Sequence, residues 1–414
     1  MVIFHIDANS AYLSWEAAYR LENGSKIDLR NIPSVVGGDP KKRSGIVLAK
    51  SIPAKKYKIR TGETLYEAKQ KCPHLVVVPP NYDLYLKCSQ AMYDILCSYS
   101  SKVQRYSVDE CFLDYTDSEK KFGDPVKTAF EIKEKIKNQL GFTINIGVSV
   151  NKLLAKMASE LKKPDALHTL FPEEIEEKLW RLPVEELFMV GRATSRKLRK
   201  ININTIGDLA CTNVNYLKAL LKTHGVVIWN YANGIDTAAV KNNNEIIQKG
   251  VGNSTTIPFD VSNEKEARMV LLALTERVSM RLRSMECLCF LVSVSIKTDG
   301  FSHSSHQMKL KSPTNSTTEI FKVVKKLFGE LWHQDPLRHL GVRVSELVSD
   351  DFYQFSFFDD FNKEKNKQLD TAIDAIRHKY GDASIIRSCF VHSRLSPIQG
   401  GVNEGDYLMM SGSL

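Results

Sequence analysis

The sequence lacks paired cysteines and long apolar runs. Its eight cysteines are spread over 414 residues, and no two of them form a CxxC motif. This spacing argues against a structural zinc site or a disulfide scaffold, and we expect reduced, mostly buried thiols. The apolar run Val2–Ile6 is interrupted by His5 and ended by Asp7, so it is too short for a signal peptide or a membrane span. We therefore expect a cytoplasmic protein with no membrane partner.

Acidic charge is also in deficit. The chain has 57 Lys and Arg against 48 Asp and Glu, a net charge of +9 and a pI near 8.9. The stretch Lys41–Lys71 is the most basic part of the first 100 residues. Such an excess is compatible with a polyanionic partner but does not require one. At roughly 100–200 residues per domain, a chain of this length is expected to form two to four domains.

Strand and helix patterns alternate through the first 170 residues. Val2–Ile6 predicts a buried strand, and Asp124 followed by Pro125 predicts the start of a helix. Phe142–Val150 alternates between apolar and small or polar residues, which predicts another strand. Residues 173–240 indicate helices throughout, and residues 241–253 resemble a linker rich in Asn and Gly. The chain is therefore expected to be an α+β multidomain protein.

Residues 250–348 predict the order β-α-β-β-α-β, a split βαβ arrangement. The predicted strands are 251–259, 288–298, 303–311 and 338–348, and the predicted helices are 263–284 and 317–332. Both helices should cover one face of the sheet. The other face would then be open and basic, which suits the phosphate backbone of DNA, and its expected DNA-binding residues are Lys297, Lys309, Lys311 and Arg343.

Three carboxylates stand where predicted strands end or break. Asp7 ends the first strand, and Asp109 with Glu110 interrupts the strand-like stretch 103–115. Adjacent strand residues point to opposite faces, so both acids can serve one site only at a turn or bulge. Together the three would offer oxygen ligands to two divalent cations. The alternative is an N-cap aspartate and a turn with exposed acids, which composition alone favours.

Several other residues have a functional and a structural interpretation. Lys163 and Lys55 could neutralise a triphosphate, or could simply be solvated lysines. Tyr12 could pack under a nucleotide sugar, or could belong to the core. Gly191 and Arg192 lie where two short helices should flank a tight turn, which could bind a DNA phosphate or form an ordinary helical hairpin.

Three segments carry a resemblance to a known family. His5–Tyr12 looks like a first metal motif that ends in a steric-gate residue, and Tyr106–Asp114 looks like a second motif. Asn145–Lys156, running on to Lys163 and Pro164, looks like a third. In this order, over roughly residues 1–360, the chain resembles the bacterial Y-family (translesion) DNA polymerases, the group of polymerase IV and of the catalytic subunit of polymerase V.

The resemblance implies a right-hand polymerase with a split βαβ (ferredoxin-like) palm, small fingers, a helical thumb and a βαββαβ little finger. The expected segments are palm 1–10 and 76–172, fingers 11–75, thumb 173–240, little finger 241–350, and a clamp-binding peptide and tail 351–414. The implied activity is low-fidelity, template-directed addition of dNTPs to a primer 3′ end by two-metal nucleotidyl transfer, in translesion synthesis and DNA repair. The implied partners are primer–template DNA and dNTPs, and the protein is expected to be a monomer.

The resemblance also assigns the site residues. The implied catalytic residues are Asp7, Asp109 and Glu110, and Ala8 would join them as a metal ligand. The cofactor would be two Mg²⁺ ions, with Mn²⁺ able to substitute. Tyr12, Lys55 and Lys163 would bind the nucleotide. A Gln-x-x-Leu-Phe-like peptide that binds the sliding clamp is expected at Gln354, Phe355, Phe357 and Phe358, and the alternative is that these aromatics pack on the little finger.

The chain departs from the family pattern at three positions. Ile52 and Lys55 stand where many members have tyrosine and arginine, and a lysine is less able to contact phosphate in two places at once. Ala11 replaces an aromatic residue beside the gate. Two rivals remain at this stage: a nucleotidyl cyclase that uses a similar palm, and a catalytically impaired DNA-binding scaffold.

Overall fold

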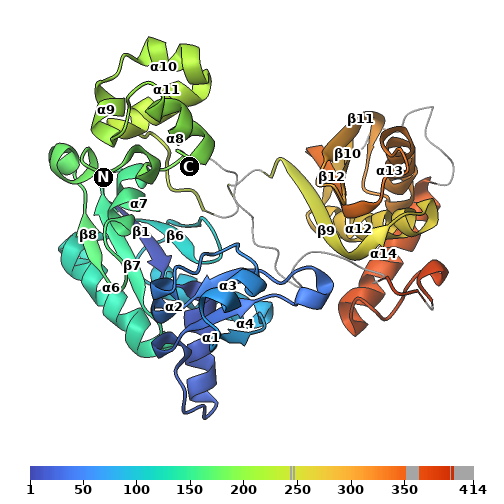
Figure 1. Ribbon diagram of the computed structural model, residues 1–414, viewed down its shortest axis with the longest axis horizontal. Helices are drawn as coiled ribbons and strands as arrows, with labels where there is room; N and C mark the ends of the chain where they lie inside the picture. Colours follow the sequence, from blue (N-terminus) through green and yellow to red (C-terminus); the bar gives the residue numbers. More distant parts are fainter. Residues whose placement is uncertain (243–244, 246–247, 351–362, 392, 396–414) are drawn as a thin grey trace. The chain divides into compact units, whose positions relative to one another are not determined.

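The structure, a computed structural model, describes residues 1–242, 245, 248–350, 363–391 and 393–395. Within the described residues it divides into two compact units (Figure 1). The first contains residues 1–38 and the chain from 46 to the expected linker. The second contains residues 39–45 and the chain beyond that linker.

A five-stranded sheet forms the centre of the first unit. Its strand order is β5-β6-β1-β7-β8. The strands are β1 (Ile3–Ala8), β5 (Val103–Arg105), β6 (Glu110–Asp114), β7 (Ile144–Ser149) and β8 (Leu167–Thr169). β1 is antiparallel to both neighbours, so Asp7 lies opposite Glu110 on one side and opposite Asn145 on the other. The predicted strands at the N-terminus and at 142–150 are confirmed.

Helices cover both faces of this sheet. The apolar residues of β7 pack with α4 (Tyr82–Cys97) and α6 (Pro125–Leu140), and α6 begins after Asp124, whose side chain accepts from Lys127 N. The opposite face lies against α7 (Lys152–Glu160). This approach needs a glycine in β7, because a Cβ on Gly147 would lie 1.9 Å from the backbone oxygen of Ala155. Asp7 belongs to the face that α7 covers.

A smaller three-stranded sheet, in the order β3-β2-β4, lies in the same unit. Its strands are β2 (Ser34–Gly37), β3 (Val47–Lys50) and β4 (Val76–Val78), and the nearby helices are α1 (Ala11–Glu22), α2 (Ile52–Lys56) and α3 (Leu65–Lys71). β4 pairs in parallel with β2. This strand therefore belongs to the smaller sheet, although the expected palm segment began at residue 76.

The stretch from 173 to 232 is mostly helical, as the sequence predicts, but residues 235–240 are not helical, although the helices were expected to reach 240. After short 3₁₀ and π turns it forms α8 (Arg192–Arg199), α9 (Ile206–Cys211), α10 (Val214–Leu221) and α11 (Thr223–Ala232). These helices share a core that includes Leu198, Ile206 and Ile228. The short α5 (Glu119–Phe122) precedes α6.

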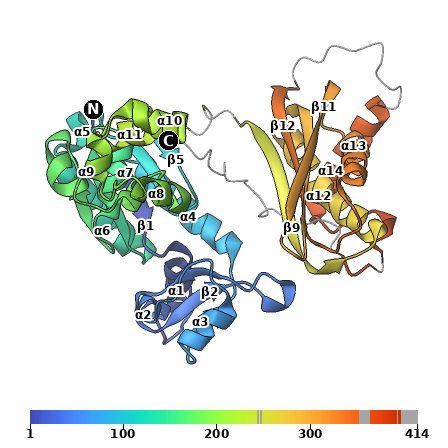
Figure 2. The same ribbon diagram turned by 45° about the horizontal axis from the view of Figure 1, so that its top comes forward.

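The second unit has the predicted order β-α-β-β-α-β. It contains β9 (Gly250–Val261), α12 (Glu264–Ser284), β10 (Cys287–Thr298), β11 (His303–Thr314), α13 (Thr317–Leu331) and β12 (Leu337–Ser349). The strands form an antiparallel sheet in the order β11-β10-β12-β9. Figure 2 shows α12, α13 and α14 (Lys363–Tyr380) on one side of this sheet. β9 begins at Gly250, so the end of the expected linker is already strand.

Alternation along these strands separates an apolar face from an open one. Val292, Val294 and Val344 are fully buried against the helices. At alternate positions on the other face, Arg343 on β12 and both Lys309 and Lys311 on β11 are exposed, and Lys297 on β10 is half-buried. The predicted basic open face is therefore present.

Helix α14 is attached to α12 by buried ion pairs. The Arg377 guanidinium lies 2.6 Å from the Glu276 carboxylate, and both side chains are 4% exposed. Arg283 binds Asp374 at 2.6 Å. Glu276 also accepts from Arg387, so the buried carboxylate has two cationic partners from the chain that follows the sheet.

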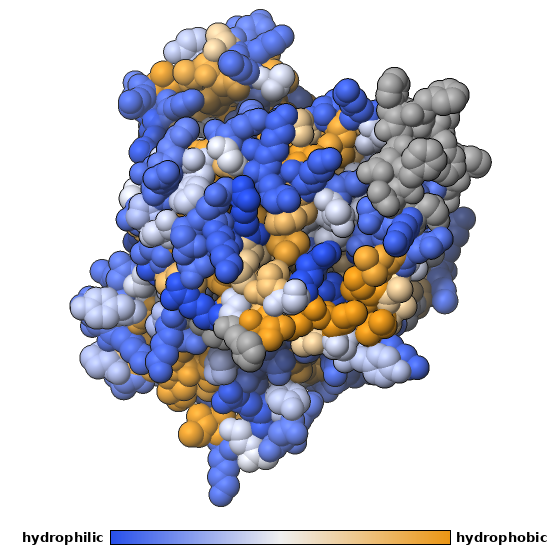
Figure 3. All heavy atoms as spheres, turned by 90° about the vertical axis from the view of Figure 1, so that its right-hand side faces the viewer, coloured by the Kyte–Doolittle hydropathy of each residue, from blue (hydrophilic) through white to orange (hydrophobic). Residues whose placement is uncertain are grey.

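The prediction that most cysteines are buried is wrong. All eight thiols are free. Cys72, Cys111 and Cys289 are buried, whereas the other five are partly or fully exposed. Among the described helices, none combines the length and apolar character needed to cross a membrane. On the face drawn in Figure 3, hydrophilic residues predominate and apolar residues form separate patches.

Candidate active site

The three predicted carboxylates meet at a turn. β5 and β6 form a hairpin in which the backbone N–H groups of Tyr106 and Ser107 both donate to Glu110 O, at 2.9 and 3.2 Å. Asp109 lies in this turn, and its carbonyl accepts from Ala8 N at 3.0 Å. The turn lets consecutive acids serve the same side of the sheet, as the sequence analysis required.

Asp7, Glu110 and Glu160 form an acidic cluster. One carboxylate oxygen from each lies within 4.8 Å of the others. Two lysines neutralise part of this charge: Lys156 donates to Glu110, and Lys163 donates to Asp7 and, at 2.8 Å, to Glu160. Ser107 Oγ links Asp109 to this cluster, because it lies 2.6 Å from Asp109 Oδ1 and 3.2 Å from Glu110 Oε2.

The carboxylates have different electrostatic environments. Burial raises the pKa of Asp7 to about 7, against the opposing influence of Lys163. Burial also raises the pKa of Asp109. Burial acts in the same direction on Glu110, but His5 and Lys156 outweigh it and hold the pKa of that carboxyl well below its usual range. The protein alone therefore compensates the ionised form of Asp7 less well than that of Glu110.

His5 is a buried neutral neighbour of the cluster. Burial and the nearby Lys156 lower the pKa of its imidazole to about 4. Its Nδ1 lies 2.7 Å from Ser159 Oγ, and its Nε2 lies 3.4 Å from Glu110 Oε1. The ring therefore lies next to Glu110 without adding a positive charge at neutral pH.

A cavity of about 610 Å³ opens beside the cluster. It brings together residues that the sequence analysis singled out separately, and those among its lining are Asp7, Ala8, Ala11, Tyr12, Ile52, Lys55, Asp109 and Lys163. Arg30 and Lys50 also line it. The lining of the cavity thus includes both acids and cations, a combination suited to a triphosphate held beside divalent cations.

Tyr12 packs against the core and also lines the cavity. Its ring stacks on Tyr85, with 4.5 Å between centroids and 12° between planes. The residue is nevertheless only half-buried and lines the cavity. Because Tyr85 packs against this ring, the Tyr12 side chain has little freedom to move away from a ligand in the cavity.

The donor set fits a hard divalent cation. Asp7, Glu110 and Asp109 offer oxygen atoms only, which is the chemistry that Mg²⁺, Ca²⁺ and Mn²⁺ prefer. The raised pKa of Asp7 indicates that the buried acids lack full compensation, and a bound cation would supply it.

The other predicted residues lie outside the cavity. Gly191 is the N-cap of α8 and Arg192 is the first residue of that helix, and both are exposed. The four basic residues of the open face belong to the second unit. The expected clamp-binding residues Gln354, Phe355, Phe357 and Phe358 lie outside the described residues.

Sequence reasoning missed three polar neighbours of the carboxylates. Lys156 and Glu160 were passed over because an acid or a lysine on a helix is most often solvated. The spacing of Lys156 and Glu160 carries a signal, since residues four apart on a helix share a face, whereas Lys163 lies past the end of α7. His5 was considered as an interruption of an apolar run and as the start of the first motif but was given no role of its own, although a histidine within a buried strand needs polar partners.

Comparisons with known proteins agree with this geometry. Residues 6–160 match the impB/mucB/samB family, and residues 248–357 match the impB/mucB/samB family C-terminal domain. The chain is 48% identical to DNA polymerase IV of Clostridium acetobutylicum over 94% of its own length and 97% of the relative's. It is 42% identical to DNA polymerase IV of Acetivibrio thermocellus, over 95% and 98%.

The chain belongs to the Y family of DNA polymerases. Solved Y-family structures have the same fold. A Y-family DNA polymerase chimera of Dbh and Dpo4 superposes with a TM-score of 0.72 at 21% identity, over 84% of this chain and all of the chimera. DinB from Sulfolobus solfataricus gives a TM-score of 0.57 at 22% identity, with the same coverage. The right-hand polymerase fold expected from the sequence is confirmed, and family membership implies use of divalent metal.

Proposed function

We propose that this Y-family chain is a template-directed DNA polymerase that adds dNTPs to a primer 3′ end in low-fidelity translesion synthesis, a cytoplasmic activity of DNA repair and damage tolerance. The observation that carries the proposal is the meeting of Asp7, Asp109 and Glu110 beside a cavity of about 610 Å³. The relatives named DNA polymerase IV, matched over nearly their whole length, support the same activity.

The carboxylates would hold two Mg²⁺ ions, with Mn²⁺ able to substitute. Asp7, Asp109 and Glu110 are the side-chain ligands in this proposal, and the Ala8 carbonyl is the fourth. Bound divalent cations supply activation of the primer hydroxyl and charge stabilisation for the departing pyrophosphate. The chain itself contributes positioning: His5 orients Glu110, and Lys156 balances its charge.

The nucleotide would occupy the cavity. Lys163 and Lys55 are the proposed partners of the triphosphate, since both line the cavity and carry the opposite charge. Lys55 lies on α2 and is exposed, so it is free to reach toward an incoming phosphate. Tyr12 would lie against the sugar, where its ring would exclude a 2′-hydroxyl.

Primer–template DNA and the sliding clamp are the proposed macromolecular partners of a monomeric enzyme. Lys297, Lys309, Lys311 and Arg343 would contact phosphates from the open face, and Gly191 with Arg192 would do so from the start of α8. The clamp would bind the peptide Gln354–Phe358. None of these contacts reads base sequence, which suits an enzyme that must accept any template.

Metal-dependent primer extension tests the proposal. The wild-type chain should extend a primer with dNTPs and Mg²⁺, and Asp109→Asn should reduce extension by several orders of magnitude while DNA binding survives, because only the charge balance of the metal site changes. Asp7→Asn and Glu110→Gln should behave alike. Asp114→Asn, at the far end of β6, is the matched control and should extend normally.

The same assay separates the rivals. A nucleotidyl cyclase would consume nucleoside triphosphate without primer or template. An impaired scaffold would bind primer–template and leave it unextended. Wild-type extension by the Asp109→Asn protein would remove the carboxylates from the mechanism.

A further inference from the structure

The turn between β10 and β11 holds an aromatic residue in a backbone conformation that favours glycine. Phe301 has a φ of 66°, whereas the preceding Gly300, which would adopt that region without strain, does not. The turn is closed by two hydrogen bonds between backbone groups, from Thr298 N to Ser302 O and from Phe301 N to Thr298 O, both at 3.0 Å. A bulky residue kept in this region is uncommon and suggests that the side chain itself is needed.

The Phe301 ring is also exposed and flanked by two cations. Its exposed fraction is 61%. Lys297 Nζ lies 4.7 Å from the ring centroid, and Arg338 Cζ lies 5.0 Å from it. The acid of the same turn, Asp299, has a carboxylate oxygen occupied by Gly300 N at 2.8 Å. An aromatic surface in water between two positive groups favours a ligand that offers both a flat ring and negative charge.

The turn continues the open basic face of the sheet. Lys297 belongs to that face and lies opposite His303 on β11 and His339 on β12. Burial, with Lys297 and His303 nearby, lowers the pKa of His339, so that imidazole is neutral and acts as a polar neighbour. Phe301 therefore stands just past the end of a surface already assigned to phosphates.

Stacking distinguishes single-stranded from double-stranded DNA. In a duplex every base face is covered by its neighbours, so a protein contacts mainly phosphates and groove edges. In a single strand the base faces are accessible, and aromatic side chains stack on them while lysine and arginine contact the backbone. A phosphate-binding face alone needs no exposed aromatic ring.

We propose that Phe301, Lys297 and Arg338 form a site for single-stranded DNA, in which one unpaired base stacks on the Phe301 ring and the adjoining phosphates bind the two cations. This site rests on the proposed function. It adds that the second unit binds the unpaired part of the template as well as duplex DNA.

The experiment measures equilibrium binding of the full chain to two probes at one fixed salt concentration. One probe is a primer–template with a 5′ single-stranded overhang, and the other is a blunt duplex of the same duplex length. Phe301→Ala is expected to weaken binding to the overhang probe by roughly tenfold and to change blunt-duplex binding by no more than about twofold. Phe301→Trp should keep the overhang affinity, and overhang DNA should quench its additional fluorescence.

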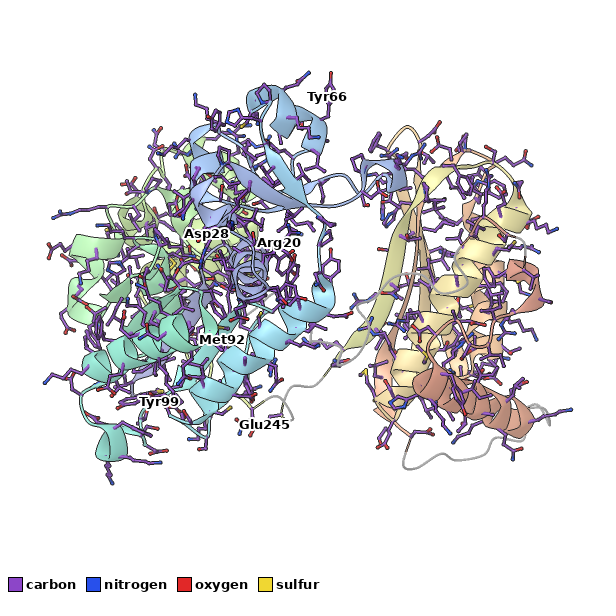
Figure 4. All side chains as sticks on the ribbon, turned by 90° about the horizontal axis from the view of Figure 1, so that it is seen from below. Arg20, Asp28, Tyr66, Met92, Tyr99 and Glu245 are labelled. Carbon is purple, nitrogen blue, oxygen red and sulfur yellow. The ribbon has the colours of Figure 1, made fainter. Side chains whose placement is uncertain are left out.

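Two further variants separate binding from folding. Phe301→Gly removes the ring but suits the backbone conformation, so it should lose the overhang affinity without a lower melting temperature. Tyr380→Ala is the matched control, because Tyr380 is 66% exposed with Lys379 Nζ 5.1 Å from its ring centroid, yet lies on the helix side of the sheet. Tyr66, 73% exposed on α3 and directed outward (Figure 4), provides a second control in the other unit. Both control variants should bind both probes normally.

The binding of the two probes by the wild type and by Phe301→Ala tests the single-strand site. Unchanged overhang binding by Phe301→Ala overturns the site and leaves the proposed function intact, provided that the wild type binds both probes. Equal losses on both probes mean that the ring contacts duplex, which overturns the single-strand assignment. A wild-type chain that binds neither probe overturns this inference together with the proposed function.

Discussion

Asp7 and Glu110 face each other because β1 and β6 are antiparallel in one particular register. A shift of that register by one residue would send Asp7 to the apolar face that packs on α4 and α6, so the position of the proposed metal site depends on the pleat of the sheet. Asp109 reaches the same cavity only because the hairpin turns directly before Glu110. The chemistry therefore depends on backbone geometry as much as on the presence of three acids.

The Tyr12 ring should determine sugar selection. Tyr12→Ala removes the wall of the cavity and is expected to lower the dNTP-to-rNTP ratio of kcat/KM by roughly tenfold or more. Tyr12→Phe, which keeps the ring on Tyr85, is the control and should leave the ratio close to that of wild type. Steady-state kinetics with both nucleotide types measures the ratio. An unchanged ratio in Tyr12→Ala would make the residue ordinary core.

Glu160 should position Lys163 for the nucleotide. Lys163 is shared between Asp7 and Glu160, so a cation bound at Asp7 would displace it and leave Glu160 as its remaining anchor. Glu160→Gln weakens that anchor, and because Glu160 is 46% exposed the effect should be a rise of about threefold in KM for dNTP, with kcat nearly unchanged. Kinetics over a range of dNTP concentrations provides the measurement.

The control for Glu160 is Glu134→Gln, which removes an acid that is paired with a lysine outside the cavity. It should leave KM unchanged. If Glu160→Gln instead shifts the concentration of divalent cation needed for activity, Glu160 is a metal ligand. A fall in KM would mean that repulsion of the triphosphate dominates, which also contradicts a positioning role.

At the scale of secondary-structure elements, the sequence predicted the features that depend on local periodicity, such as which residues of a strand share a face. The open face of the second unit follows from alternation along β10, β11 and β12, and the structure agrees with it. What the sequence could not predict are partners far away in the chain. The buried Glu276 on α12 pairs with Arg377, which lies about a hundred residues later in the chain. The strand β4 is too short for its sequence pattern to indicate that it pairs with β2.

The open face predicts a salt dependence. Replacing Lys297, Lys309, Lys311 and Arg343 by alanine should flatten the slope of log affinity against log salt by about three to four, roughly one for each lost phosphate contact. The value falls short of a full four because Lys309 already binds Glu346 at 2.6 Å and would have to exchange that partner. Binding to primer–template DNA across a salt series measures the slope.

The helix layer of the same unit provides a control with equal charge. Four lysines on α12 and α13, replaced by alanine together, remove the same net charge from the opposite side of the sheet; they are Lys265, Lys322, Lys325 and Lys326. The slope should then change little, because long-range attraction is screened at physiological salt. Equal slopes for the two quadruple variants would contradict a specific DNA-binding face.

At the scale of the whole molecule, the prediction succeeded where separate signals agreed. The carboxylate motifs lie in the first 164 residues, whereas the basic open face and the βαββαβ order lie in residues 250–348, yet one architecture explains all of them. The cavity itself could not be predicted from one segment, because its lining comes from α1, β3, α2, the β5–β6 turn and the stretch after α7. The burial of the cysteines was misjudged for a related reason, since exposure depends on which elements come together in three dimensions.

The last prediction concerns how such an enzyme remains on its template. Apart from the stacking on Phe301, the proposed DNA contacts are with phosphates, so binding should be sensitive to salt and the enzyme should dissociate readily at physiological ionic strength. A peptide that binds the sliding clamp would compensate, because a tether raises the effective concentration at the primer end by an amount on the order of 10²–10⁴ without a new contact in the active site. Gln354→Ala combined with Phe357→Ala and Phe358→Ala is therefore expected to abolish clamp-stimulated synthesis and leave synthesis on naked primer–template unchanged. Primer extension with and without clamp measures both. A triple variant that unfolds, or that the clamp still stimulates, would mean that these aromatics belong to the core and that any tether lies elsewhere.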